Sequence, residues 1–344
     1  MTRWAVILAG GVGSRFWPLS TPQRPKQLLP LVDDQPLLAD TVQRLAPLVD
    51  AEHTLIITNA IVADAVRTLL PRVPASNVIA EPRSAGTAPA LAWAAAEIER
   101  RDGPDATMVC VHADWAIADP DTFRDTLARA AEAAARHTSL VTVGVVPTRP
   151  DPGFGYIQPG EDVDGARHVA RFVEKPDRTT AERMMRDGYL WNSGIFAWRA
   201  GDFLDEIRTH TPEVAPALDC AAAGDARRFF SDVRSISVDN GVLERSARVL
   251  VVPGDFGWDD VGTWAALRRV RALDADGNAV AGDTHLVASR DNVVHAEGNT
   301  VVLYGVSDLV VVTRAGLTLV TTVERAADLK LLLDALPPAV RDIP

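Results

Sequence analysis

The feature that most constrains this chain is the alternation of short apolar runs with helical stretches over roughly its first 265 residues. The runs at 4–9, 54–58, 77–80, 107–112 and 140–146 have the length and composition of buried strands. Between them, residues 37–48, 60–70, 88–101 and 122–137 are rich in Ala, Leu and Arg, and their apolar residues recur every three or four positions. This alternation predicts an α/β fold with a Rossmann-like, mixed but mostly parallel sheet that carries helices on both faces.

The pattern changes after about residue 270. A polar stretch at 272–279 has the composition of a linker, and short β-type runs follow at 293–295, 300–304, 309–312 and 317–321. A helix is expected at 326–336. We therefore predict a catalytic domain at 1–268 and a small β-rich module at 280–344.

Composition and charge narrow the partners. The net charge of −11 argues against nucleic acid, because binding its backbone needs a basic face. No apolar run is long enough to cross a bilayer, so no membrane partner is expected. The two cysteines, Cys110 and Cys220, have no metal-ligand spacing and suggest reduced thiols. We expect a cytoplasmic protein.

A glycine loop (residues 10–31) follows the first predicted strand. Its glycines, Gly10, Gly11 and Gly13, let the backbone approach a bulky anion and donate N–H groups to it. A dinucleotide fingerprint would need a glycine where Phe16 stands, and a Walker loop would need Gly-Lys-Ser/Thr. Neither motif is present, so both interpretations fail.

The same loop is stiffened by proline and carries cations. Its prolines at positions 18, 22 and 25 rule out a regular helix. An open loop is therefore expected to carry its own positive charges: Arg15, Arg24 and Lys26. Together, the glycines and the cations indicate a binding site for a phosphate chain.

Residues 8–31, LAGGVGSRFWPLSTPQRPKQLLPL, resemble the signature loop of the bacterial mannose-1-phosphate guanylyltransferases, a branch of the sugar nucleotidyltransferases. The resemblance continues in further motifs along essentially the whole chain. It implies an enzyme that uses Mg²⁺ to convert GTP and mannose 1-phosphate into GDP-mannose and pyrophosphate. It also implies that Gly10, Gly11, Gly13 and Arg15 surround the triphosphate and that Lys26 contacts phosphate.

Glu81-Pro-Arg and the run from Gly86 to Ala90 form the second motif. The resemblance makes Glu81, Thr87 and Ala88 candidate contacts to guanosine. A carboxylate at Glu81 can accept from both guanine N1–H and the exocyclic amine, which adenine cannot match. The alternative is a loop followed by a helix that Thr87 caps.

Three later motifs resemble the sugar-phosphate site of the family: GFGY, FVEKP and WNSGIF. Here Gly155 would allow a pyranose to approach closely, while Glu174 and Asn192 would fix its hydroxyls. Lys175 would neutralise the phosphate of the sugar. Each motif alone could be a turn or a surface ion pair, but all three occur in the order found in the family.

The resemblance assigns Asp114 and Asp260 as the ligands of Mg²⁺, which accepts carboxylates together with phosphate oxygens. Trp115 stands where the family usually has His, which weakens a role for that side chain. The block 237–244 matches the family only in part, because Asn240 stands where Tyr is common. Asp239 is therefore a further candidate, and the role of Glu244 stays open.

These residues suggest in-line attack of the sugar phosphate on the α-phosphorus of GTP, with Arg15, Lys26, Lys175, Asp114 and Asp260 as the catalytic group. The first alternative is the same chemistry with another sugar 1-phosphate, such as glucose 1-phosphate, or another nucleotide. The second is a non-catalytic regulatory protein that binds GDP-mannose. The tail resembles the short left-handed β-helical module of single-function relatives, so we expect a homodimer.

Overall fold

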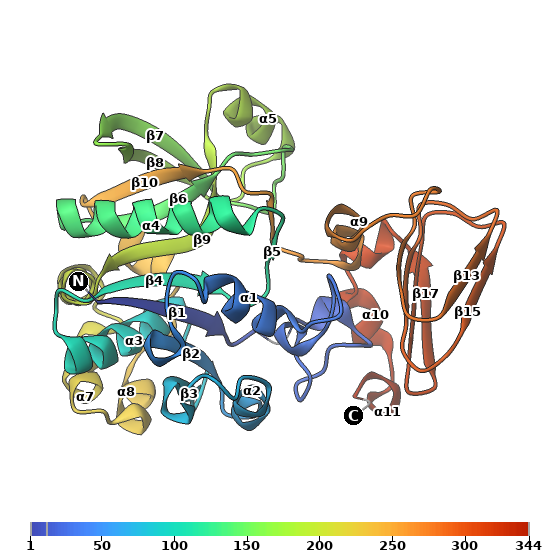
Figure 1. Cartoon of the computed structure of the whole chain (residues 1–344), viewed down its shortest axis with the longest axis horizontal. Coiled ribbons are helices and arrows are strands. Elements are labelled where there is room, and N and C mark those ends of the chain that lie inside the picture. The colour runs from blue at the N-terminus through green and yellow to red at the C-terminus, as the bar shows by residue number, and fades with distance from the viewer. Residues whose placement is uncertain (1, 12, 343–344) are drawn as a thin grey trace. The chain divides into compact units, whose positions relative to one another are not determined.

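The computed structural model describes residues 2–11 and 13–342 of the 344-residue chain. They form two compact units, each made of separate chain segments (Figure 1). Unit 1 comprises residues 1–10, 43–112 and 119–256, and unit 2 comprises residues 11–42, 113–118 and 257–344. The predicted division into a domain at 1–268 and a module at 280–344 uses continuous segments of the sequence, and it stays a prediction. In the described ranges, no helix is long and apolar enough to span a membrane.

Unit 1 is built on one mixed sheet with the strand order β3-β2-β1-β4-β9-β6-β10-β8-β7. Its strands are β1 (Arg3–Ala9), β2 (Thr54–Asn59), β3 (Val78–Glu81), β4 (Thr107–His112), β6 (Leu140–Val145), β7 (Tyr156–Val163), β8 (Ala166–Val173), β9 (Leu190–Arg199) and β10 (Val249–Gly254). The neighbours from β3 to β4 are parallel, as are β6 and β10. The remaining pairs are antiparallel. The α/β class with a mixed sheet is confirmed.

The helices of unit 1 cover both faces of the sheet. They are α2 (Ala63–Leu69), α3 (Thr87–Asp102), α4 (Pro120–His137), α5 (Arg178–Arg186), α6 (Ala200–His210), α7 (Leu218–Ala222) and α8 (Ala226–Asp232), while α1 (Leu37–Leu45) runs from unit 2 into unit 1. Helix α3 shares one core with alternate residues of β1 and β4, such as Val6 and Cys110. Helix α4 instead packs on β4, β6, β9 and β10.

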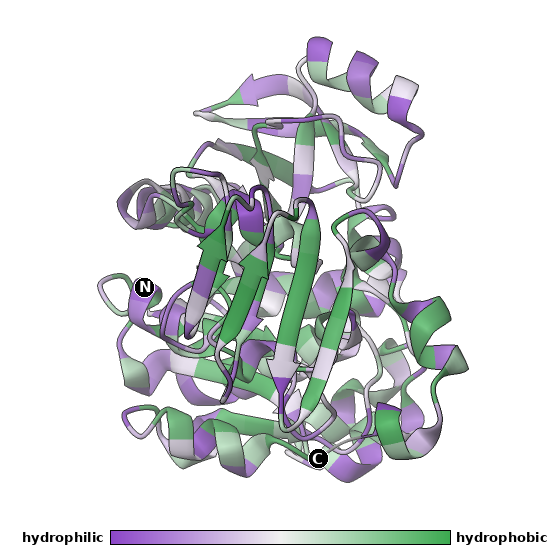
Figure 2. Cartoon of the chain, turned by 90° about the vertical axis from the view of Figure 1, so that its right-hand side faces the viewer, coloured by the Kyte–Doolittle hydropathy of each residue, from purple (hydrophilic) through white to green (hydrophobic). Residues whose placement is uncertain are grey.

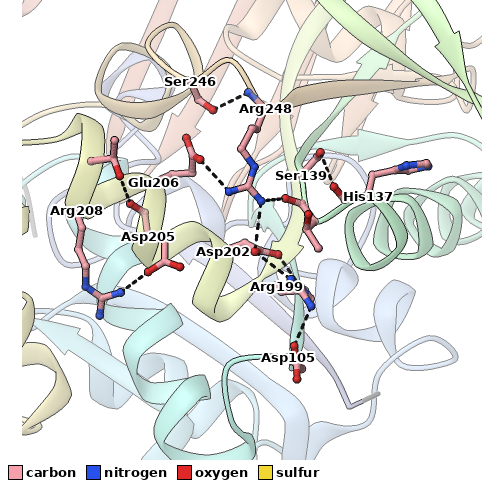
Figure 3. Close-up of polar contacts among 12 residues, drawn as sticks. Asp105, His137, Ser139, Arg199, Asp202, Asp205, Glu206, Arg208, Ser246 and Arg248 are labelled. Carbon is pink, nitrogen blue, oxygen red and sulfur yellow. Dashed lines mark hydrogen bonds and ion pairs between the residues drawn. The ribbon is translucent and has the colours of Figure 1, made fainter.

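A charged network fixes helix α6 against the neighbouring segments of unit 1 (Figure 3). Arg199 pairs with Asp202 at 2.6 Å and with Asp105 at 2.9 Å. Arg248 reaches Glu206 at 3.3 Å. These carboxylates and guanidinium groups satisfy one another, so we assign the network a structural role.

Unit 2 contains the glycine loop, a small two-stranded ladder and the C-terminal strands. The ladder pairs β5 (Ala116–Ile117) antiparallel with β11 (Trp258–Asp259). The C-terminal elements are α9 (Leu267–Val270), β12 (Ala279–Ala281), β13 (Thr284–Val287), β14 (Val293–Ala296), β15 (Val301–Tyr304), β16 (Leu309–Arg314), β17 (Leu317–Thr322), α10 (Lys330–Ala335) and α11 (Pro338–Arg341). The predicted helix at 326–336 is shorter in the structure, because Arg325–Ala327 is a separate 3-10 turn.

The C-terminal module (residues 279–322) stacks β12, β14 and β16 in parallel, and β13 and β15 likewise, while β17 pairs antiparallel with β16. Ala279 pairs with Val293, which pairs with Val310, and Thr284 pairs with Val301. Buried Asn278 and Asn292 form a ladder at one corner, where Asn292 Nδ2 donates to Asn278 Oδ1 at 2.9 Å. Stacked amides of this kind stabilise rungs of equal shape. The arrangement is consistent with the predicted β-helix-like module.

Candidate functional site

In unit 1, the carboxyl ends of the parallel strands bring Gly10 and Glu81 together. Glu81 ends β3, Gly10 follows β1, and a Cβ on Gly10 would lie 3.3 Å from Glu81 Oε2. Ligands of open α/β sheets bind at this edge. Burial raises the pKa of the Glu81 carboxyl from about 4.5 to about 7. The side chain of Glu81 lies beside the backbone of Gly10.

Thr87 and Ala88 open helix α3, but Thr87 does not cap it. The N-cap residue is Gly86, whose φ of 87° suits glycine, so the capping expectation for Thr87 is wrong. Thr87 Oγ1 accepts from the amide of Val238 at 2.8 Å, and the amide of Ala88 donates to the carbonyl of Ile236 at 3.2 Å. Both bonds hold the segment that leads into Asp239. A nucleotide contact for either residue stays a prediction.

A second cluster in unit 1 joins three of the residues that the family motifs single out, together with Asp239. A Cβ on Gly155 would lie 2.8 Å from Glu174 Oε2, so a side chain at this position would displace the Glu174 carboxylate. Asn192 donates its backbone N–H to the carbonyl of Gly155 and its side-chain Nδ2 to Asp239 Oδ1, both at 2.8 Å. The Oδ1 atom of Asn192 is buried and has no hydrogen-bond partner among the described residues. This oxygen can accept a hydrogen bond from a hydroxyl group of a ligand.

Asp239 is the residue that sequence reasoning left open and that the structure brings into the cluster. It begins a π-helical turn, Asp239–Leu243, and such turns are frequent at functional sites. Burial raises its pKa, and the bond from Asn192 opposes that rise. Glu244, in contrast, accepts from Asn240 at 3.0 Å and contacts none of the cluster in the described structure.

Lys175 lies at the edge of the cluster with its ammonium in solvent. Its Nζ donates to Glu174 Oε1 at 2.7 Å, and its side chain is 63% exposed. The backbone of Lys175 has a φ of 43°, which is costly for a residue with a side chain. A strained residue that presents an exposed cation beside buried polar groups fits a binding role.

In unit 2, the glycine loop is compact where its sequence demands it. Gly13 has a φ of 69°, and a Cβ on it would lie 2.3 Å from Cβ of Lys26. Only glycine therefore lets the two arms of the loop meet here. A Cβ on Gly11 would meet nothing within 4 Å. Arg15 is exposed and, within the described part of the chain, forms no ion pair or hydrogen bond, so its guanidinium is available to an anion.

Lys26 is the centre of unit 2. Its side chain is 7% exposed, and its Nζ donates to Asp114 Oδ2 at 3.0 Å and to the carbonyl of Asp260 at 2.8 Å. The ammonium also lies 5.7 Å from the centre of the Phe16 ring. The cation expected to contact phosphate is thus held between the two segments that carry the predicted metal ligands.

The β5–β11 ladder explains why Asp114 and Asp260 are neighbours. Asp114 precedes β5 by two residues and Asp260 follows β11, so antiparallel pairing places them at the same end. Burial raises the pKa of Asp260, as do Asp259 and Asp114, while Lys26 lowers it. Asp259 differs from Asp260, since Arg269 holds both its oxygens at 2.6 and 3.0 Å. Trp115 packs edge-on against Trp258 and is buried.

Two neighbouring carboxylates suit a divalent cation that takes its other ligands from phosphate and water, as Mg²⁺ does. A complete protein cage of three or more acidic, His or Cys ligands does not occur in the described ranges. The donor set therefore fits a metal that arrives with a phosphorylated ligand. It does not fit a structural zinc or calcium site.

Comparisons with known proteins identify the family. A family model described as nucleotidyl transferase matches residues 4–277. A mannose-1-phosphate guanylyltransferase of Escherichia coli is 39% identical over 94% of this chain and 72% of its own length. The xanthan biosynthesis protein XanB of Xanthomonas campestris is 37% identical over 98% of this chain and 73% of its own length. A crystal structure described as mannose-1-phosphate geranyltransferase from Thermus thermophilus has a TM-score of 0.89, is 34% identical, and is covered to 99% by 97% of this chain.

The raised pKa of Glu81 predicts a pH dependence of stability. The folded-state pKa of about 7 exceeds the usual 4.5. Between these two pH values, Glu81 is therefore protonated in the folded protein and ionised in the unfolded chain. The free energy of unfolding should therefore fall as pH rises from 4.5 to 7, by about 3 kcal/mol from this group. Urea unfolding of wild type and Glu81→Gln at several pH values measures the difference. Parallel curves for the two proteins would contradict the assignment.

Proposed function

Because this chain belongs to the nucleotidyl transferase family, and within it to the mannose-1-phosphate guanylyltransferases, we propose that it transfers GMP from GTP to α-D-mannose 1-phosphate. The products are GDP-mannose and pyrophosphate. The observation that carries this proposal is the buried Lys26 ammonium between Asp114 and Asp260. Cys110 and Cys220 are free thiols, which supports a reducing, cytoplasmic location.

Glu81 selects the base. Its carboxylate accepts from guanine N1–H and from the exocyclic amine, and Gly10 beside it has no side chain that would crowd this carboxylate. Glu81 must be ionised to accept both hydrogen bonds from guanine, although burial favours its neutral form. The two N–H donors of guanine stabilise the ionised form, while adenine offers no such pair. Thr87 and Ala88 would then border the nucleoside.

Arg15, Lys26 and the loop amides bind the triphosphate. The exposed Arg15 guanidinium offers several N–H donors to the leaving pyrophosphate, and the open backbone at Gly11 allows phosphate to approach closely, while Gly13 lets the loop pack on Lys26. Asp114 and Asp260 would hold Mg²⁺, which supplies charge neutralisation at the α- and β-phosphates when bound. Lys26 keeps the two acids in place through Asp114 and through the backbone of Asp260.

The sugar phosphate binds the second cluster of unit 1. Oδ1 of Asn192, which has no partner among the described residues, accepts a hydrogen bond from a sugar hydroxyl, while Glu174 and Asp239 accept hydrogen bonds from further hydroxyls. Lys175 exchanges its ion pair with Glu174 for the phosphate of mannose 1-phosphate. A phosphate oxygen then attacks the α-phosphorus, the bond to the β-phosphate oxygen breaks, and pyrophosphate leaves with that oxygen. The nucleophile is already an anion, so no general base is needed.

A homodimer is proposed through the outer face of the C-terminal module. Val302 and Tyr304 on β15 and Val287 on β13 are 65, 78 and 54% exposed, and Tyr304 pairs with Val287. Figure 2, with the module facing the viewer, shows hydrophobic residues along these strands. Exposed apolar side chains on adjacent strands favour association. Light scattering should give twice the chain mass of 37.0 kDa, and Tyr304→Asp should give the monomer mass. A wild-type monomer at all concentrations would contradict the proposal.

The activity is tested by pyrophosphate release with Mg²⁺, using GTP, ATP, UTP and dTTP against mannose 1-phosphate and glucose 1-phosphate. We expect the fastest release with GTP and mannose 1-phosphate, and none in EDTA. Another preferred pair would keep the chemistry and overturn the specificity assigned to Glu81 and the sugar cluster. Absence of release with every pair would favour a non-catalytic protein that binds GDP-mannose.

Lys175→Ala should lower kcat/KM about 10- to 150-fold, because it removes a charge-assisted bond to the attacking phosphate. The effect is expected on mannose 1-phosphate rather than on the KM for GTP. Arg178→Ala is the matched control, since Arg178 is a nearby cation, 75% exposed, that pairs with Glu182. Steady-state kinetics compare both variants. Equal activity of Lys175→Ala and the control would remove Lys175 from the site.

A further inference from the structure

The glycine loop has little regular structure of its own. Between residues 13 and 31 it contains only two 3-10 turns in the described chain, Ser14–Phe16 and Lys26–Leu28. Such turns are short and do not fix a long segment by themselves. The position of Arg15 and Lys26 must therefore be set by contacts from elsewhere in unit 2.

Those contacts come from residues beyond position 260. Trp264 Nε1 donates to the carbonyl of Trp17 at 3.2 Å, and Arg314 Nη1 donates to the carbonyl of Pro18 at 3.0 Å. Arg271 Nε donates to the carbonyl of Leu31 at 2.6 Å. The backbone of the loop thus satisfies its carbonyl groups on the C-terminal part of the chain.

Arg271 and Arg314 are themselves buried and fixed. Arg271 is 8% exposed and lies 3.0 Å from Nδ1 of His295 on β14, and burial holds the pKa of His295 at about 3. The imidazole is therefore neutral and accepts from the guanidinium. The apolar side of the loop, with Phe16, joins the same core as Val293 of the module.

Arg24 makes the shorter of two charged contacts to Glu297, whose Oε1 also lies 4.0 Å from Nε of Arg314. The sequence marks Arg24 as a loop cation for phosphate, but its Nη1 donates to both oxygens of Glu297, at 2.9 and 2.8 Å. Glu297 follows β14, and its amide donates to the carbonyl of Thr313 on β16 at 3.0 Å, so the ladder of the module fixes it. Arg24 closes a tight turn with Thr21, in which each amide donates to the carbonyl of the other.

The link from Arg24 to the site is short. Only Pro25 separates Arg24 from Lys26, and the ring of proline restricts the backbone at that position. A shift of Arg24 therefore moves Lys26, whose Nζ lies 3.0 Å from Asp114. Displacement of a positioning group by about 1 Å can reduce catalysis about 100-fold.

We propose that Glu297 of the C-terminal module is a positioning residue for the reaction, holding the glycine loop through Arg24 so that Arg15 and Lys26 meet the triphosphate. This inference rests on the proposed function of the loop. It gives the module a part in catalysis within one chain, separate from any part in dimer formation. It also removes Arg24 from the phosphate ligands.

Charge reversal tests the proposal in the full-length protein. Arg24→Glu and Glu297→Arg should each lower kcat/KM for GTP by about tenfold or more, with little change in the KM for mannose 1-phosphate. The double variant should be more active than either single variant, because the pair is restored with its charges exchanged, but less active than wild type, because Arg314 also lies 4.0 Å from Glu297 and would then face a cation. If Arg24 contacted phosphate itself, the double variant would stay as impaired as Arg24→Glu, and the proposal would fail.

Hydrogen exchange of the loop amides gives a readout that does not depend on activity. Residues 13–31 should exchange faster in both single variants and in Glu297→Gln, and more slowly in the double variant than in either single charge reversal. Arg268→Glu is the matched control, since Arg268 pairs with Asp291 in the same unit at similar exposure, 29 and 38% against 32 and 38%. In Arg268→Glu, the amides of residues 13–31 should exchange at the wild-type rate.

These outcomes separate the two claims. A wild-type protein without transferase activity would overturn the proposed function, while the exchange data would still decide whether Glu297 holds the loop. Unchanged loop exchange and unchanged kcat/KM in Glu297→Gln and Glu297→Arg would overturn the positioning role. Melting temperatures of all variants identify any that fail to fold, and the double variant and Glu297→Gln then carry the test.

Discussion

The arrangement of unit 2 depends on one buried ammonium group, that of Lys26. A buried charge is tolerated only when it is paired and hydrogen-bonded. Lys26 meets this condition by joining three segments that are distant in sequence: the glycine loop, the turn at Asp114 and the end of β11 at Asp260. Gly13 is required because its bare backbone packs on the Lys26 side chain. The two acids expected to bind metal therefore lie where a cation already fixes their segments.

The residues of the proposed mechanism fall in separate parts of the chain. Glu81 and the cluster around Asn192 lie in unit 1, and the loop cations and the two acids lie in unit 2. The glycine loop follows β1 of unit 1 in sequence. From residue 11 onward it is part of unit 2, because it packs with the C-terminal strands. The module thus supports the loop as well as presenting an apolar face.

Much of the parallel half of the sheet could be predicted from the sequence. The runs at 4–9, 54–58 and 107–112 match β1, β2 and β4 closely, because strands buried on both faces are continuous apolar runs. Helix 60–70 begins three residues later than predicted, at Ala63. The two-residue strands β5 and β11 are too short to leave a pattern. They nevertheless bring Asp114 and Asp260 together.

Candidate residues were identified by motif, but their partners were not. The bond of Arg24 to Glu297 spans 273 positions, and no local pattern marks it. The hydrogen bond of Asn192 to Asp239 likewise joins distant segments, so Asp239 could be named only as a candidate. Thr87 is a residue type that often caps helices, yet Gly86 is the N-cap of α3. The backbone of Ile236 lies so close to Gly86 that no Cβ fits there.

The most direct measurement is the anomalous scattering of Mn²⁺ in crystals grown with GTP. The account predicts a Mn²⁺ peak within about 2.0–2.3 Å of carboxylate oxygens of both Asp114 and Asp260, with phosphate oxygens completing the shell. Lys26 should remain hydrogen-bonded to the carbonyl of Asp260. A peak that touches neither carboxylate, in a crystal where GTP is clearly bound, would contradict the account.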